Sequence, residues 1–189
     1  MDLSKYNNAG FNRGASLAKH ACWLVTGGVL MSSWLPGSGW RRSVLRLFGA
    51  KIGTAVVIKP GVRVKFPWRL SIGDYSWIGE DVWIDNLAEV RIGCNVCVSQ
   101  GVYICTGSHD WSRETFDLIV KPVIFRDHSW ACAFCRLSPG AVMEEGAVLA
   151  MGCLGSGNLS AWSIHSNSPE NIVKLRPGAP ENFVRPKQG

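Results

Sequence analysis

The chain has 189 residues, of which 47% are hydrophobic and 18% are charged, and it contains 21 glycines. This composition excludes a disordered chain and favours one turn-rich β domain over a helical bundle. The net charge of +6 would suit an anionic partner such as a nucleic acid, a membrane surface or a phosphorylated cofactor. No run of lysine and arginine is long enough to predict nucleic-acid binding.

Residues 1–50 carry no strand-like repeat, and we expect them to form a helical segment that covers one open end of the domain. Within this segment residues 21–40 are uncharged. Gly27-Gly28 and Pro36-Gly37 interrupt that run and leave about fifteen apolar-leaning residues, fewer than the roughly 20 that a membrane-spanning helix needs. Peripheral contact with a membrane surface is the alternative interpretation of this segment.

A repeat begins at Lys51. Three blocks of twenty residues, 51–70, 71–90 and 91–110, each have Ile-Gly at their second and third positions. Aliphatic residues recur every six positions inside the blocks, at Ile52, Ile58, Val64, Ile72, Ile78, Ile84, Ile92, Val98 and Ile104. After an interruption the period returns, in coils of eighteen residues, with less typical residues at Phe125, Ala131, Leu137, Met143 and Leu149.

A period of six residues fits neither an amphipathic helix nor a half-buried strand. Three short strands per coil, joined by tight corners, produce it, with one aliphatic side chain of each strand pointing inward. A β-sandwich with the period by chance is the disfavoured alternative. We therefore predict an all-β solenoid, a parallel β-helix over residues 51–156, with residues 157–189 as a C-terminal cap and tail.

The repeat stops after Ser108 and resumes near Val123, so we expect an inserted loop at about 110–122. Loops on rigid scaffolds often carry function. Ser108 takes a small-residue corner position and is expected to face inward, which would turn His109 outward. Because neighbours on an extended chain point apart, Ser108, His109 and Asp110 do not form a nucleophilic triad. His109 is a candidate general base, and a solvated surface histidine is the alternative.

The seven cysteines are odd in number, and no signal-peptide pattern follows Met1, so we expect a reducing, cytoplasmic location. Two Cys-x-x-Cys pairs, Cys94 with Cys97 and Cys132 with Cys135, resemble zinc knuckles. Their separation exceeds the roughly 15–20 residues usual between knuckles, so we predict no metal site.

Four stretches are typical of one family: RSVLRLFGAKIG (42–53), the sequence Phe66-Pro67-Trp68, SIGDYSWIGEDVWIDNL (71–87) and VSQGVYICTGSHD (98–110), followed by Phe116 and Lys121-Pro122. On these residues the chain resembles the hexapeptide-repeat acyltransferases, and most closely the colanic acid biosynthesis acetyltransferases. The resemblance implies a left-handed β-helix that assembles as a homotrimer. It further implies that acetyl-CoA, the acyl donor, and an acceptor bind in grooves between neighbouring subunits.

The resemblance also implies roles for individual residues. His109 falls on the family's catalytic histidine, which would take the proton from an acceptor hydroxyl. Asp85 and Asn86 fall in the substrate-binding coil, with turn geometry as the alternative. The positions that fall along the CoA groove are Trp130, Ala133, Met151, Ser156 and Lys174. A packed surface aromatic is the alternative for Trp130, and a solvated tail is the alternative for Lys174 and Arg176.

These roles predict an O-acetyltransferase acting on a sugar, a nucleotide sugar or another glycosylated small molecule. Later coils depart from the family pattern at Phe125-Arg126, Ala131-Cys132, Leu137-Ser138 and Ser156-Gly157-Asn158. An N-acetyltransferase or other acyl-CoA transferase, and a non-catalytic β-helix binding protein, are therefore the alternatives. A γ-class carbonic anhydrase would need three histidines that meet at a metal, whereas His109, His128 and His165 are scattered.

Overall fold

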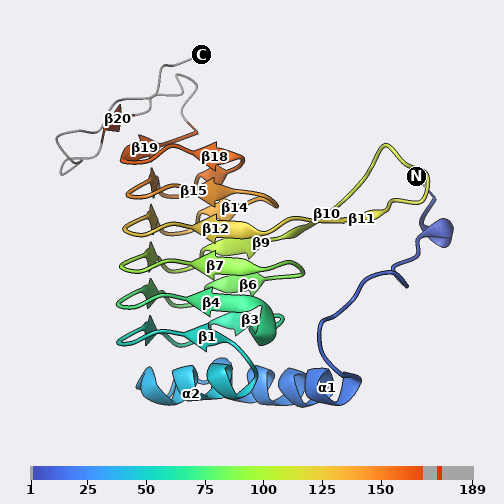
Figure 1. The fold of residues 1–189 in the computed structure, drawn as a ribbon, viewed down its shortest axis with the longest axis horizontal. Helices are drawn as coiled ribbons and strands as arrows, with labels where there is room; N and C mark the ends of the chain where they lie inside the picture. The colour runs from blue at the N-terminus through green and yellow to red at the C-terminus, as the bar shows by residue number, and fades with distance from the viewer. Residues whose placement is uncertain (1, 168–173, 176–189) are drawn as a thin grey trace.

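The computed structural model describes residues 2–167 and 174–175. A short 3-10 helix, η1 (Leu3–Lys5), is followed by α1 (Leu17–Thr26), the π-helical η2 (Gly27–Met31) and α2 (Gly39–Leu47). From β1 onward the chain winds into a stack of coils, and α1, η2 and α2 lie across the bottom of that stack (Figure 1). No helix among the described residues is both long and apolar enough to cross a bilayer.

Three sheets form the sides of the stack, with one short strand per coil. Sheet A contains β1 (Lys51–Ile52), β4 (Leu70–Ile72), β7 (Val90–Ile92), β12 (Val123–Phe125), β15 (Val142–Met143) and β18 (Asn158–Leu159). Sheet B contains β2 (Val57–Ile58), β5 (Trp77–Ile78), β8 (Cys97–Val98), β13 (Trp130–Ala131), β16 (Val148–Leu149), β19 (Ser163–His165) and β20 (Lys174–Leu175). Sheet C contains β3 (Arg63–Val64), β6 (Trp83–Asp85), β9 (Tyr103–Cys105), β14 (Arg136–Leu137) and β17 (Leu154–Gly155). All neighbours are parallel except β20, which runs antiparallel to β19.

The predicted solenoid and its inward-facing residues are confirmed. Ile52 pairs with Ile72, and Ile72 with Ile92, so the twenty-residue blocks are successive coils. Every aliphatic position of the six-residue period is buried, including the atypical Phe125 and Ala131. The solenoid continues past the expected boundary at residue 156, through β18 and β19. Phe125 pairs with Met143, but Met143 pairs with Leu159, so the last coil is two residues shorter and its period is hard to see in the sequence.

The Ile-Gly pairs place glycine where coils stack backbone on backbone. At Gly73 an added Cβ would lie 2.6 Å from the carbonyl carbon of Gly93 in the next coil. Other corners use the left-handed backbone region, in which glycine is favoured and asparagine is tolerated. Asn95 has φ 55°, while Tyr75 and His128 adopt φ of 57° and 62° at equivalent corners. Corner shape is therefore imposed by the stack and not only by residue preference.

The inserted segment begins earlier than expected. It is a hairpin of β10 (Gly107–His109) and β11 (Leu118–Val120), which projects away from the stack (Figure 1). The expectation that Ser108 faces inward is wrong, because Ser108 is exposed. Thr106 fills the corner instead: its buried hydroxyl donates to Asp85 O at 3.0 Å and accepts from Ala88 N at 2.9 Å. The chain therefore leaves the coil at Gly107, before Ser108 can occupy a corner.

The N-terminal segment is more than a helical cap. Ahead of α1 the chain runs beside the stack as far as the hairpin (Figure 1). There Asp2 N donates to Glu114 O at 2.9 Å, and Lys5 Nζ lies 2.5 Å from a carboxylate oxygen of the same Glu114. These contacts, with the ring contact between Tyr6 and His109, place residues 2–6 against the inserted loop.

The close stacking at Gly73 gives a stability prediction. Gly73→Ala should lower the free energy of unfolding by about 1–3 kcal/mol, because the new methyl group meets backbone that cannot move aside easily. Gly28→Ala is the matched control, since a Cβ there meets nothing within 4 Å. Urea unfolding followed by circular dichroism measures both. Equal stability of the two variants would contradict the close-stacking explanation.

Candidate active site

His109 lies at the end of β10, where the hairpin opens into its loop. Its Nδ1 lies 2.9 Å from the carbonyl oxygen of Phe116. A carbonyl oxygen only accepts hydrogen bonds, so Nδ1 must carry the hydrogen. In the neutral imidazole the other nitrogen, Nε2, then holds a lone pair and can accept a proton. Backbone geometry thus selects the tautomer that a general base needs.

Two aromatic rings fix the plane of this imidazole. Phe116 stacks on His109 with ring centroids 4.3 Å apart and an interplanar angle of 1°. Tyr6, from the N-terminal segment, meets the same ring edge-on at a centroid distance of 5.3 Å. Phe116 adopts φ 51°, and its amide donates to Arg113 O at 3.1 Å. The loop is therefore a closed turn whose backbone holds the carbonyl that orients His109.

Asp110 does not serve His109. Its carboxylate oxygen Oδ1 accepts hydrogen bonds from the hydroxyl and the amide of Ser112, at 2.5 and 3.0 Å. These bonds, together with the nearby Arg113 guanidinium, hold the pKa of Asp110 below its usual value. With Ser108 exposed as well, the three consecutive residues form no triad. The prediction that these residues form no triad agrees with the structure. The inward orientation of Ser108, which was one argument for that prediction, does not.

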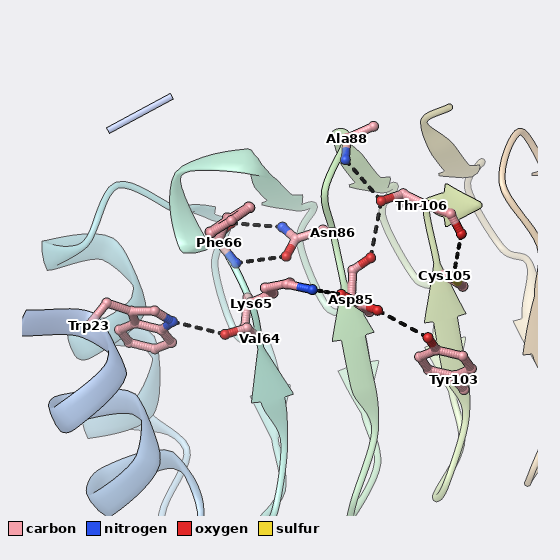
Figure 2. A network of polar contacts seen from close by, with 11 residues as sticks. Trp23, Val64, Lys65, Phe66, Asp85, Asn86, Ala88, Tyr103, Cys105 and Thr106 are labelled. Carbon is pink, nitrogen blue, oxygen red and sulfur yellow. Dashed lines mark hydrogen bonds and ion pairs between the residues drawn. The ribbon is translucent and has the colours of Figure 1, made fainter. Parts of the chain in front are cut away.

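Asp85 sits at the end of β6, one coil below the strand that leads to His109. Lys65 Nζ lies 2.9 Å from Asp85 Oδ1, and the Tyr103 hydroxyl donates to Oδ2 at 3.1 Å (Figure 2). The Asp85 side chain is only 15% exposed, whereas Lys65 is 43% exposed. Burial, the contact with Cys105 and the negative charge of Asp85 all raise the pKa of Tyr103 far above its normal value. A carboxylate, an ammonium and a neutral phenol therefore meet on the outer face of sheet C.

Asn86 has a different environment from its neighbour Asp85. It is fully buried, with Oδ1 accepting from Phe66 N at 2.9 Å and Nδ2 donating to Phe66 O at 2.7 Å (Figure 2). Both polar atoms of the amide are thus used to close the corner between sheets C and A. Turn geometry accounts for Asn86, and the acceptor contact expected for it gains no support from this arrangement.

The candidate CoA residues lie on other parts of the stack. Trp130 projects from sheet B, and its Nε1 donates to Ser99 Oγ at 2.9 Å. Ala133 and the exposed Met151 share the next corner, between sheets B and C, where Gly152 N donates to Ala133 O at 2.9 Å. Ser156 is exposed after β17, at the corner between sheets C and A. Lys174 is described only as a backbone position in β20, and Arg176 lies outside the described residues.

One chain does not bring all these residues together. The hairpin of His109 leaves from the corner between sheets C and A, as the turn after Asp85 does, whereas Ala133 and Met151 lie at the opposite edge of sheet C. Sequence reasoning missed Lys65, Tyr103 and Tyr6. Lys65 could have been found from the repeat, because Lys65 and Asp85 are twenty residues apart and both follow an inward-facing residue. Tyr6 had no such signal.

Of the seven cysteines, Cys135 is buried and Cys22 is exposed, and the other five are partly buried. Cys135 is buried and donates to Ala150 O at 3.0 Å, and burial raises its thiol pKa to about 11. Burial also raises the pKa of the Cys132 thiol. Across residues 2–167 and 174–175, no group of three or more His, Cys, Asp or Glu side chains is placed to hold a metal ion.

Several known proteins are similar to this chain in sequence or in fold. WcaF of Escherichia coli K12, an acetyltransferase assigned to colanic acid biosynthesis, is 34% identical over 179 residues, covering 93% of this chain and 97% of WcaF. A hexapeptide-repeat acetyltransferase of Vibrio cholerae, solved with acetyl coenzyme A, superposes with a TM-score of 0.73 at 20% identity, covering 86% and 89% of the two chains. A maltose O-acetyltransferase of Clostridium difficile 630 gives 0.74 at 17% identity, covering 85% and 87%. No protein-family model matches the chain.

The three-sided coil stack is shared with the hexapeptide-repeat acetyltransferases, and the identity with WcaF makes this chain an acetyltransferase of that class. The identity with WcaF extends over nearly the whole of both proteins. The chain therefore belongs to the WcaF family of colanic acid biosynthesis acetyltransferases.

The raised pKa of Tyr103 predicts a change of stability at alkaline pH. The unfolded phenol ionises near pH 10, while the folded phenol stays neutral, so its contribution is complete below pH 10 and is lost as pH rises above it. The wild type should lose up to about 1.4 kcal/mol per pH unit more than Tyr103→Phe above that point. Urea unfolding between pH 8 and pH 11 measures the difference. Parallel curves for the two proteins would contradict the burial of a neutral phenol.

Proposed function

We propose that this protein transfers an acetyl group from acetyl-CoA to a hydroxyl of a sugar, a nucleotide sugar or a glycosylated acceptor, with His109 as the general base. The observation that carries the proposal is the hydrogen bond from His109 Nδ1 to Phe116 O, which leaves Nε2 as the proton acceptor. The donor is inferred from the Vibrio cholerae structure, whose acetyl-CoA complex shares this fold.

The chemistry needs one proton acceptor and one oriented hydroxyl. Nε2 of His109 removes the hydroxyl proton as the acceptor oxygen attacks the thioester carbonyl of acetyl-CoA. The tetrahedral intermediate then collapses, the carbon–sulfur bond breaks, and the same imidazolium returns its proton to the departing thiolate. Acetyl ester and free CoA thiol are the products, and His109 regains its starting protonation state. The stacked Phe116 and the Tyr6 edge keep the imidazole in one plane throughout.

A sugar suits the polar cluster on sheet C. Asp85 accepts hydrogen bonds, while Lys65 donates them and remains partly exposed. Hydroxyl groups of a sugar can both donate to the carboxylate and accept from the ammonium. The relatives point the same way, since WcaF is assigned to polysaccharide biosynthesis and the Clostridium difficile protein is named for maltose. Asp85 is the acceptor-binding residue in this proposal.

The separation of His109 from Trp130, Ala133 and Met151 supports assembly. A groove that combines them needs the His109 hairpin of one subunit and the edge carrying Trp130, Ala133 and Met151 from the next. A closed ring of three three-sided stacks supplies such a groove at each interface. Trp130 and Met151 are exposed apolar side chains that suit the pantetheine arm of CoA. We propose a homotrimer with three such sites, located in the cytoplasm, where acetyl-CoA is available.

The first prediction from this proposal concerns His109 as the general base. His109→Ala should lower acceptor-dependent release of CoA thiol by about 10²-fold or more, which is the scale of general-base catalysis. The assay follows thiol release from acetyl-CoA across a panel of sugars and nucleotide sugars, with amino sugars included to separate O-acetylation from N-acetylation.

His20→Gln is the matched control, because His20 packs on Phe66 and Trp68 in the first coil, away from the hairpin. Its activity should stay close to that of the wild type. Full activity of His109→Ala would overturn the base assignment. No thiol release by folded wild type with any acceptor, together with no binding of acetyl-CoA in a titration, would favour a non-catalytic β-helix.

The second prediction concerns the shared groove. Met151→Glu places a charge on the exposed edge that should bind CoA, so this variant and His109→Ala should each be poorly active alone. When the two variants are coexpressed in equal amounts and mix at random, about a quarter of the grooves combine a native His109 with a native Met151. Activity of the purified mixture should therefore recover to about a quarter of the wild-type value. A mixture no more active than its parents would contradict a site built from two subunits.

A further inference from the structure

The helical layer at the bottom of the stack has an apolar outer face. In α1 and η2, Trp23 and Met31 are buried against the first coil. Side chains on the other side of these helices and in the following turn are large, apolar and between 59% and 84% exposed: Leu17, Leu24, Val25, Val29, Trp34 and Leu35. A helix that packs on a soluble domain normally exposes polar residues on its outer side. This layer has apolar residues on both sides.

The layer is held firmly against the solenoid. Trp23 Nε1 donates to Val64 O at 2.9 Å, which ties α1 to β3 (Figure 2). The buried Arg41 of α2 donates to the carbonyl oxygens of Ser33, Leu35 and Gly37 and so fixes the turn that carries Trp34. The exposed apolar side chains therefore belong to a structured surface and not to a loose end of the chain.

Positive charge surrounds this apolar face. Between Leu3 and Gly73 the sequence has eleven lysines and arginines but no aspartate or glutamate. The cations exposed beside the helices or on the first coil are Arg13, Arg46, Lys51, Lys59, Arg63 and Lys65, of which Lys65 pairs with Asp85. After Asp2, the next acidic residue in the sequence is Asp74, in the second coil. Along the axis of the stack an apolar layer is thus followed by a cationic layer and only then by mixed charge.

We propose that this base, formed by α1, η2 and the turn to α2, docks on the surface of an anionic lipid bilayer. The apolar side chains would enter the boundary between headgroups and acyl chains, and the cations of the first coil would meet the lipid phosphates. Because the helices lie across the stack (Figure 1), the β-helix would stand upright on the membrane. Acceptors carried at that surface would then meet the enzyme near its second and third coils.

A second copy of the chain fits this face less well. A symmetric contact between two bases would bring two cationic layers together, with no acidic residue in residues 3–73 to pair with them. Anionic headgroups neutralise the same charges. The charge pattern therefore favours lipid over self-association.

The test is cosedimentation of the full chain with vesicles. Wild type should bind vesicles that mix phosphatidylglycerol with phosphatidylcholine, should bind pure phosphatidylcholine much less, and should be released by high salt. The double variant Val29→Ser/Trp34→Ala should bind about tenfold or more weakly, because it removes exposed apolar area. Lys51→Glu/Lys59→Glu should weaken binding only to the anionic vesicles.

Trp111→Ala is the matched control, since Trp111 is 82% exposed on the hairpin loop and Trp34 is 84% exposed on the base. Its vesicle binding should equal that of the wild type, and circular dichroism should show all variants folded. Failure of wild type to bind anionic vesicles, or equal binding by the Trp34 and Trp111 variants, would overturn the proposal. Self-association that the Val29→Ser/Trp34→Ala change abolishes, without vesicle binding, would assign the face to a second copy. Catalysis is not measured, so the result is independent of the proposed acetyl transfer.

Discussion

The structure depends on one constraint, the parallel stacking of each coil on the next at backbone contact distance. Gly73 and Gly93 approach so closely that no Cβ fits between them, and Ile52, Ile72 and Ile92 pair in one column. Any outward side chain is then placed by its position in the coil. Lys65 and Asp85 meet for this reason, because they occupy equivalent positions in successive coils.

His109, the candidate general base, lies on a hairpin that forms where the stacking of coils is interrupted. Thr106 fills the corner at the point where the chain leaves the coil, so the hairpin can project without exposing the core. The hairpin then satisfies its own backbone and side chains, and one of its carbonyls, that of Phe116, orients His109. A rigid solenoid and a closed loop together hold an imidazole whose Nδ1 is bonded to Phe116 O, so that Nε2 lies on the other side of the ring.

The same geometry separates functions along the molecule. The base of the stack is apolar and cationic, the middle carries the polar cluster of Asp85 and the hairpin of His109, and the later coils carry Trp130 and Met151. A three-sided stack points its corners apart, which is why the proposed active site draws on two subunits. The proposed assembly and the proposed lipid contact use different surfaces, one along the sides of the stack and one at its end.

The amino-acid sequence alone predicts the coil, the inward-facing residues and the interruption near His109, because a six-residue period repeats wherever one strand per side must bury one side chain. It also identified Asp85 as a candidate, but it treated Asn86 in the same way. Only the tertiary structure separated them, by burying the Asn86 amide against Phe66. Ser108, Tyr6 and the short last coil were likewise decided by the fold, since a corner, a contact across distant segments and a change of coil length leave no periodic signal.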